Sequence, residues 1–119
     1  MPFKDSTIDN RKLGSAIGTG ECVALVQEWT HAPNTHGWKP GLQVYGNEDK
    51  IPKGTAIATF VNGQYPTDER HAAIFLSGAG TAGFRVVDQW HGQVSHERTI
   101  HFNSSGRQND PKAYYVIEN

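Results

Sequence analysis

The apolar positions in the first quarter of the chain are organised around one segment, residues 21–29. Four residues in it occur at the i, i+3, i+4 and i+7 spacing of one buried helical face: Cys22, Leu25, Val26 and Trp29. The segment contains no glycine, proline or asparagine, so a helix can continue through it. Gly18 and Gly20 permit a tight turn before the helix, with Thr19 or Gly20 as its N-cap. We therefore predict a helix over residues 20–31.

In the second half of the chain, short runs rich in β-branched and aromatic residues alternate with turn residues. These runs predict strands at residues 55–61, 71–76, 84–90, 98–102 and 113–117. Glycine-rich residues 77–83 predict a long, flexible loop that joins two of these strands into a hairpin. Residues 32–41 are so dense in proline, asparagine and glycine that we predict a loop there, followed by a short extended piece at 42–45.

A helix followed by strands in hairpin order predicts an α+β fold. We expect an N-terminal central helix packed on an antiparallel sheet of about five strands, in a single domain over residues 1–119. A net charge of −1 and a pI near 6.6 argue against nucleic acid as the main partner, since binding it would require a basic face. No apolar run is long enough to cross a bilayer, so we predict no membrane insertion.

The N-terminus is polar and lacks the apolar core of a secretory signal peptide. A protein of this kind that acts outside its cell therefore needs another export route. The single cysteine excludes an internal disulfide.

Cys22 is the first candidate for chemistry. It stands in the first turn of the predicted helix, where unpaired backbone N–H groups and the helix dipole favour a thiolate. A thiol in that position is a candidate nucleophile. The alternative is a structural cysteine buried on the apolar helix face, and the segment taken alone favours this second interpretation.

A thiolate nucleophile needs a base and a third group that orients the base. His71 is the best candidate for the base, because it begins an apolar strand directly after the charged turn at 67–70. Asp88 lies within the next apolar strand, where a carboxylate is costly without a partner. In the predicted hairpin His71 lies across from Asp88 to Trp90. Gln89 is an alternative third residue, since neighbouring strand positions face opposite ways, and Asp88 can instead face solvent.

The other five histidines do not form a convincing site. His91, His96 and His101 are each five residues apart, a spacing that flips faces on a strand and is off-register on a helix. His31 and His36 stand in or beside the polar loop. We therefore predict no metal site and no cofactor.

Three motifs, taken in order, resemble those of the papain-like cell-wall hydrolases, namely the cysteine, histidine-dependent amidohydrolase/peptidase (CHAP) group and its NlpC-type relatives. They are Gly-Glu-Cys-Val at 20–23, His-Ala-Ala-Ile-Phe at 71–75 and Val-Val-Asp-Gln-Trp at 86–90. The similarity spans about residues 15–102. The small size and the missing signal peptide are also similar to the amidase effectors that bacteria inject into rivals through type VI secretion.

The resemblance implies a papain-like fold, with Cys22 as nucleophile, His71 as general base and Asp88 as the residue that orients His71. It implies hydrolysis of an amide bond in a peptidoglycan peptide through an acyl-enzyme. It also implies synthesis in a bacterial cytoplasm, action in the periplasm of a target cell after non-classical secretion, and a cognate immunity protein as partner. We expect a monomer.

The chain departs from this family pattern around the oxyanion hole. Glu21 replaces the usual glutamine before the cysteine, and no glutamine lies upstream to donate a side-chain hydrogen bond. The Cys22 backbone N–H can supply one donor, and Thr19 or Ser15 a second. Gln89 is a further supporting residue. The chain also lacks the acidic calcium loop of some phage relatives.

Trp38, Tyr65 and Trp90, with the glycine-rich segment, are predicted to line a substrate groove. Trp38 stands in a loop, where recognition residues are common, whereas Tyr65 and Trp90 are equally suited to a core. Two other functions stay open on these residues. One is a papain-like peptidase or deamidase acting on proteins, and the other is a non-catalytic interaction domain with a structural cysteine.

Overall fold

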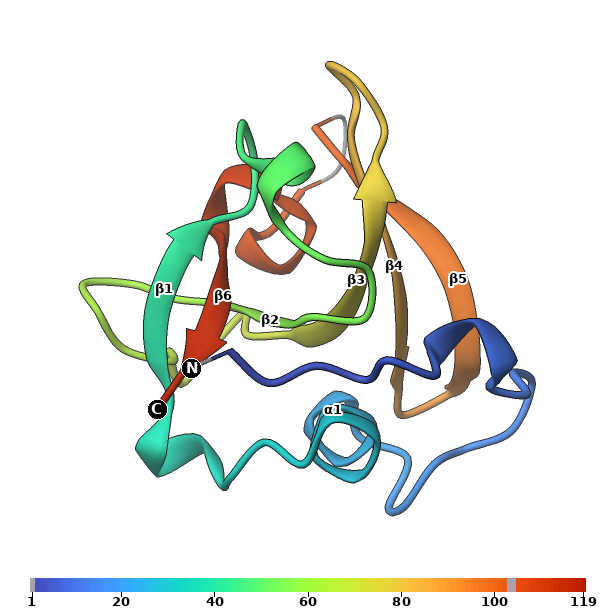
Figure 1. Cartoon of the computed structure of the whole chain (residues 1–119). Helices are drawn as coiled ribbons and strands as arrows, with labels where there is room; N and C mark the ends of the chain where they lie inside the picture. Colours follow the sequence, from blue (N-terminus) through green and yellow to red (C-terminus); the bar gives the residue numbers. More distant parts are fainter. Residues whose placement is uncertain (1, 103–104) are drawn as a thin grey trace.

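The computed structural model describes residues 2–102 and 105–119. Its centre is a six-stranded antiparallel sheet in the order β1-β6-β2-β3-β4-β5 (Figure 1). The strands are β1 Lys39–Gln43, β2 Ala56–Thr59, β3 Ala72–Gly78, β4 Gly83–Trp90, β5 Gln93–His101 and β6 Tyr114–Glu118. Helix α1, Cys22–Thr30, packs on this sheet. The predicted α+β architecture is therefore confirmed, with one strand more than expected.

The extra strand is β1, in a segment whose first part was predicted to be loop. Lys39 pairs with Glu118 and Pro40 with Ile117 of β6. β1 is an edge strand, so Pro40 can lack a backbone donor without breaking the ladder on its open side. Proline and glycine at 40–41 predicted a loop, and that prediction was wrong for residues 39–41.

Helix α1 begins two residues later than predicted, with Glu21 as the N-cap in place of Thr19 or Gly20. Gly18 and Gly20 both have positive φ, 59° and 88°, in the turn that leads into it. The helix ends at Thr30, and the next residue, His31, takes the left-handed conformation that glycine usually takes at a helix C-terminus. The first residue of the helix is therefore Cys22 itself.

The glycine-rich segment is partly strand, and the loop within it is only residues 79–82. β3 continues to Gly78 and β4 starts at Gly83, and Ser77 and Gly78 pair with Arg85 and Phe84. A Cβ at Gly83 would lie 1.9 Å from the carbonyl oxygen of Ile100 on β5. Gly83 is therefore required by close strand contact, and the loop of the predicted hairpin is shorter than expected.

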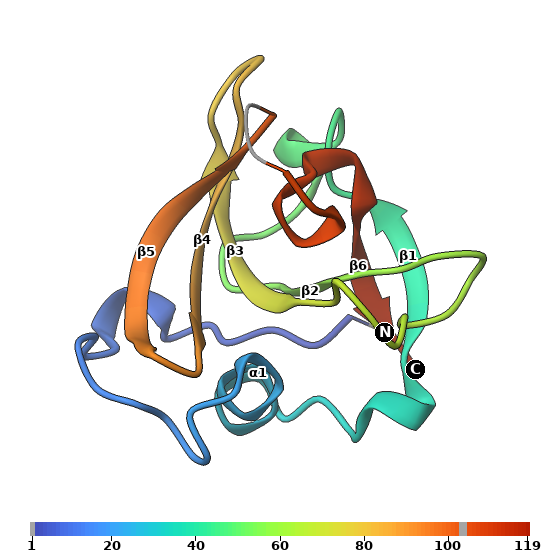
Figure 2. The same cartoon turned by 180° about the vertical axis from the view of Figure 1, so that it is seen from behind.

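The sheet has an apolar core on each face. One face packs on α1, where Leu25, Val26 and Trp29 belong to the same buried cluster as Ile74 and Val87. The other face curves around the turns at residues 107–113, which lie inside the curve of the sheet in both views (Figures 1 and 2). Among the described residues, no helix is long and apolar enough to cross a membrane.

Candidate active site

His71 and Asp88 form a buried pair at the start of strand β3. The His71 Nε2 and the Asp88 Oδ2 are 2.7 Å apart, and the two residues are 5% and 0% exposed. The His71 backbone is fixed by Thr59 of β2, whose hydroxyl accepts from the His71 N–H. The antiparallel pairing of β3 with β4, with Ile74 opposite Val87, brings the two side chains together. The buried carboxylate of Asp88 therefore has a hydrogen-bond partner in His71.

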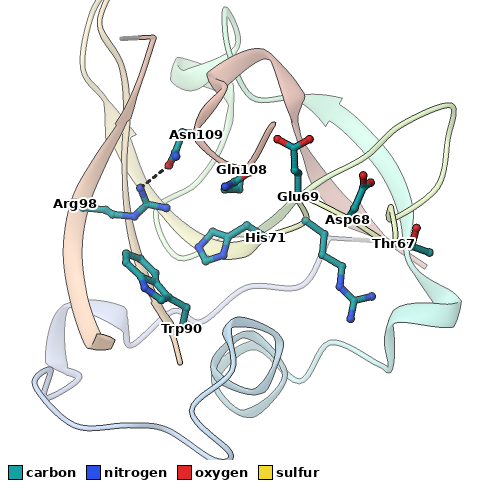
Figure 3. Close-up of a pocket in the computed structure, with 9 residues that line it drawn as sticks. Thr67, Asp68, Glu69, His71, Trp90, Arg98, Gln108 and Asn109 are labelled. Carbon is teal, nitrogen blue, oxygen red and sulfur yellow. Dashed lines mark hydrogen bonds between the residues drawn. The ribbon is translucent and has the colours of Figure 1, made fainter. Parts of the chain in front are cut away.

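Arg98 of β5 holds the same carboxylate from the other side. Its Nε donates to Asp88 Oδ2 at 2.7 Å, and its Nη1 donates to Asn109 at 3.2 Å (Figure 3). Burial raises the pKa of Asp88, but the hydrogen bond with His71 and the charge of Arg98 outweigh burial and lower it below the ordinary value. Asp88 is therefore ionised at neutral pH. Sequence reasoning missed Arg98.

The Cys22 thiol faces the His71 ring from the first residue of α1. Burial raises the pKa of the thiol, but the hydrogen bond with His71 and the charge of its ring lower it, with smaller help from the Ala72 N–H and the Tyr65 hydroxyl. The net pKa is lower than that of an ordinary cysteine. Because Asp88 occupies Nε2, Nδ1 is the ring nitrogen left for the thiol.

The same contacts act on the imidazole. Burial lowers the pKa of His71, but the hydrogen bonds with Asp88 and Cys22 raise it to about 9. The pair therefore favours thiolate beside imidazolium. A thiolate at a helix start, next to an imidazolium held by a buried carboxylate, can attack a carbonyl carbon and protonate the leaving group.

Gln89 faces away from His71 and binds the segment before the helix. Its Oε1 accepts from the Ile17 N–H at 2.8 Å, and its Nε2 donates to the carbonyls of Ile17 and Glu21 at 2.8 and 2.9 Å. Of the two candidates for the third position, Asp88 is thus the one that contacts His71. Thr19 lies exposed in the turn before α1, and its role as an oxyanion donor stays a prediction.

The three predicted groove aromatics lie in different surroundings. Trp90 is 40% exposed and its ring stands edge-on to His71, with centroids 6.0 Å apart. Trp38 is 4% exposed, and its indole N–H donates to the Pro33 carbonyl at 2.8 Å. It packs edge-on against Tyr65, with centroids 4.9 Å apart. Trp38 therefore supports Tyr65 from the core, and its predicted contact with substrate stays a prediction.

Cys22 lies in one of three neighbouring surface hollows. A hollow of about 230 Å³ holds Cys22 together with Tyr65 and Trp90. A second, of about 390 Å³, lies on the His71 side and shares Trp90 (Figure 3). A third, of about 440 Å³, lies on the other side and shares Tyr65. The glycine-rich residues 77–83 stand at the far end of β3 from His71, beside a separate hollow.

Histidine, cysteine and acidic side chains are not gathered into a metal site in the described part of the chain: no three of them lie close enough to hold an ion.

Comparison with known proteins extends over almost the whole chain. The sequence model of the family described as domesticated amidase effector 2 matches residues 4–117. A type VI secretion amidase effector 2 protein from Salmonella typhi is 35% identical, over 92% of this chain and 91% of that protein. The domesticated amidase effector 2 of Ixodes scapularis is 39% identical, over 82% of this chain and 70% of that protein.

A solved structure shows that the fold is also shared with this family. The structure of type 6 secretion amidase effector 2 matches with a TM-score of 0.85 and 31% identity, over 98% of this chain and 94% of that one. In sequence and in fold, this chain belongs to the domesticated amidase effector 2 family.

Proposed function

We propose that this protein is a cysteine amidase that hydrolyses amide bonds in peptidoglycan peptides through an acyl-enzyme. The observation that carries the proposal is the continuous set of contacts from the Cys22 thiol to His71 and from His71 Nε2 to Asp88, 2.7 Å away. The word amidase in the names of the relatives supports the reaction class. The order of the three residues supports kinship with the CHAP and NlpC-type enzymes.

In the first half-reaction the Cys22 thiolate attacks the amide carbonyl carbon and forms a tetrahedral intermediate. When this collapses, the C–N bond breaks and the His71 imidazolium gives its proton to the leaving amine. In the second half-reaction neutral His71 takes a proton from water, and the resulting hydroxide attacks the thioester. The C–S bond breaks, the acid is released, and the thiolate and imidazolium are restored.

Asp88 serves this cycle by fixing the ring of His71. A buried carboxylate next to Nε2 keeps a proton on that nitrogen, so that Nδ1 is the nitrogen that exchanges a proton with the thiol. The same carboxylate stabilises the imidazolium form. Arg98 keeps that carboxylate ionised and in place. Loss of a residue of this kind lowers turnover by about 10³-fold or more in related arrangements.

Tyr65 and Ala72 stabilise the thiolate. The Tyr65 hydroxyl is buried and, within the described residues, has no hydrogen-bond partner. The group that it faces is the Cys22 sulfur. Burial and the nearby thiolate raise the pKa of Tyr65, so the phenol keeps its proton and can donate it. The Ala72 N–H adds a second donor.

The oxyanion of the intermediate forms beside the start of α1. We assign the Cys22 backbone N–H as one donor, with Thr19 as the candidate for the second. Gln89 contributes indirectly, because its bond to the Glu21 carbonyl fixes the turn that presents both groups.

Delivery by type VI secretion into the periplasm of a target cell, and a matching immunity protein, are part of the same proposal. They rest on the name of the Salmonella typhi relative.

Digestion of purified sacculi tests the proposal. The wild-type protein should create new amino termini in the peptides of the sacculi, whereas Cys22→Ala and His71→Gln should create none. His101→Gln is the matched control, because His101 is exposed on β5 and lies outside the hollows around Cys22. Digestion by Cys22→Ala would refute a cysteine mechanism. Cleavage of proteins but not of sacculi would favour a protein peptidase.

A further inference from the structure

Arg70 lies where the three hollows around the thiol meet. It lines the hollow that holds Cys22, the hollow on the His71 side and the hollow on the Tyr65 side. Tyr65 and Trp90 each line two of these. A substrate lying across the sulfur in either direction therefore has to pass Arg70.

The acidic neighbours of Arg70 already have partners. Asp68 is paired with Arg107 at 3.3 Å, and Glu69 accepts from the Arg107 backbone N–H at 3.2 Å. Glu21, across the Cys22 hollow, lies 3.5 Å from His91. Within the described residues, Arg70 makes no ion pair with any carboxylate. Its guanidinium is thus free of any carboxylate partner among the described residues, beside a histidine that itself favours the charged form.

The side chain of Arg70 is held in place by the ring of Tyr65. Its guanidinium carbon lies 5.5 Å from the centre of the Tyr65 ring. Stacking of this kind occupies the flat face of a guanidinium and leaves its N–H groups, which point outward in the plane, available for two parallel hydrogen bonds. The ligand that fits such a fork best is a carboxylate.

We infer that Arg70 forms a subsite for a free carboxylate of the peptide substrate, next to the amide that is cut. This inference rests on the proposed function and adds the substrate feature that the site selects. Stem peptides of peptidoglycan carry free carboxylates, at branch points and at the C-terminus, and amidation converts them to neutral carboxamides. Amidation at the recognised position removes the charge that Arg70 binds.

The experiment uses synthetic muropeptides in which one carboxylate at a time, at the branch or at the C-terminus, is replaced by a carboxamide. Each is assayed with the wild-type protein and with Arg70→Gln, Arg70→Lys and Arg85→Gln. Arg85 is the matched control, because it is a half-buried arginine on β4 that pairs with Glu97 outside all three hollows.

We expect the wild-type kcat/KM to fall about 10- to 100-fold when the recognised carboxylate is amidated, as for loss of a charge-assisted hydrogen bond. On the free acid, Arg70→Gln should lower kcat/KM by the same factor, mainly by raising KM. On the carboxamide, the kcat/KM of Arg70→Gln should equal that of the wild type. Arg70→Lys should recover part of the loss, because it keeps the charge but not the fork. Arg85→Gln should match the wild type. The peptide that shows the effect identifies which carboxylate is bound.

Equal losses by Arg70→Gln on acid and carboxamide would overturn the inference and leave Arg70 as a packing partner of Tyr65. Equal rates of the wild type on every peptide would overturn it too. If the wild-type protein digests sacculi in a Cys22-dependent way, these results count against Arg70 alone. If it cuts neither sacculi nor peptides, the proposed function fails and the inference fails with it.

Discussion

Arg98 and His71 bind the same oxygen of Asp88, each at 2.7 Å. The carboxylate thus lies between a residue of strand β5 and the residue that directly precedes strand β3. A fully buried carboxylate with one partner removed is left with a large desolvation penalty. The position of the His71 ring therefore depends on an arginine that never reaches the thiol.

Replacement of Arg98 by methionine tests that dependence. Methionine keeps the apolar stem that packs by Trp90 but removes the charge, so the pKa of Asp88 should rise and its hold on His71 should weaken. We expect kcat/KM on muropeptides to fall about 10-fold or more, and the free energy of unfolding in urea to fall by about 1–3 kcal/mol. Arg85→Met, at an exposed ion pair, should change unfolding by less than about 0.5 kcal/mol. Wild-type activity in Arg98→Met would contradict this role.

The pH dependence should differ between alkylation and hydrolysis. The pKa of Cys22 is lowered from 9.0, against the effect of burial, by the hydrogen bond and charge of His71, whose own pKa is raised to about 9. Alkylation by iodoacetamide needs only the thiolate, so its rate should rise at acidic to neutral pH and then stay level. Hydrolysis also needs imidazolium to protonate the amine, so kcat/KM should fall again as pH passes about 9.

His71→Gln provides the control for that profile. Without the imidazolium, alkylation should require pH values closer to the ordinary cysteine pKa of 9.0. Identical alkylation profiles for His71→Gln and the wild type would show that His71 does not act on the thiol.

The signals that led to Cys22, His71 and Asp88 are all local. A cysteine at a helix start, a histidine at a strand start and a carboxylate in an apolar strand each stand out without knowledge of their partners. The pairing of β3 with β4 is a hairpin between neighbouring strands, so it too can be predicted from sequence. The unusual position of each residue in its own helix or strand is therefore also what brings the three together in the structure.

The features that were missed depend on contacts between distant segments. β1 pairs with β6, more than 70 residues away, and nothing within residues 39–43 indicates that partner. A glycine is needed at position 83 because β5 passes close to it, but from the local sequence alone this glycine predicts a loop. Arg98 resembles any exposed strand arginine until the register of β5 places it beside Asp88. Trp38 does stand in a loop, but its burial was missed because the core that covers it is assembled from other elements.

Tyr65→Phe should separate thiolate stabilisation from packing. Phenylalanine keeps the edge contacts with Trp38 and Phe60 and removes only the hydroxyl. We expect the thiol pKa to rise and alkylation near pH 6.5 to slow about 3- to 10-fold, for loss of about one hydrogen bond to a charged group. The free energy of unfolding in urea should be unchanged or slightly higher, because the substitution removes a buried hydroxyl that has no hydrogen-bond partner within the described residues. Tyr115→Phe, on β6 and also against Phe60, is the control.

Two results would contradict the role of Tyr65. An unchanged alkylation profile with unchanged hydrolysis would leave Tyr65 as a packing residue. An unchanged alkylation profile with slower hydrolysis would move its hydrogen bond from the thiolate to the oxyanion.

Gln89 should matter for turnover although it never touches the thiol or His71. Its three hydrogen bonds fix Ile17 and Glu21, so replacement by methionine, of similar volume, leaves the Ile17 N–H without its partner and frees the turn before α1. We expect a loss of about 1–3 kcal/mol in unfolding free energy and a lower kcat with little change in KM. Faster amide exchange at residues 17–21 should accompany both changes. Gln93→Met, at an exposed amide on β5, is the matched control. A Gln89→Met protein that loses stability but keeps its kcat would show that Gln89 supports the fold without positioning the nucleophile.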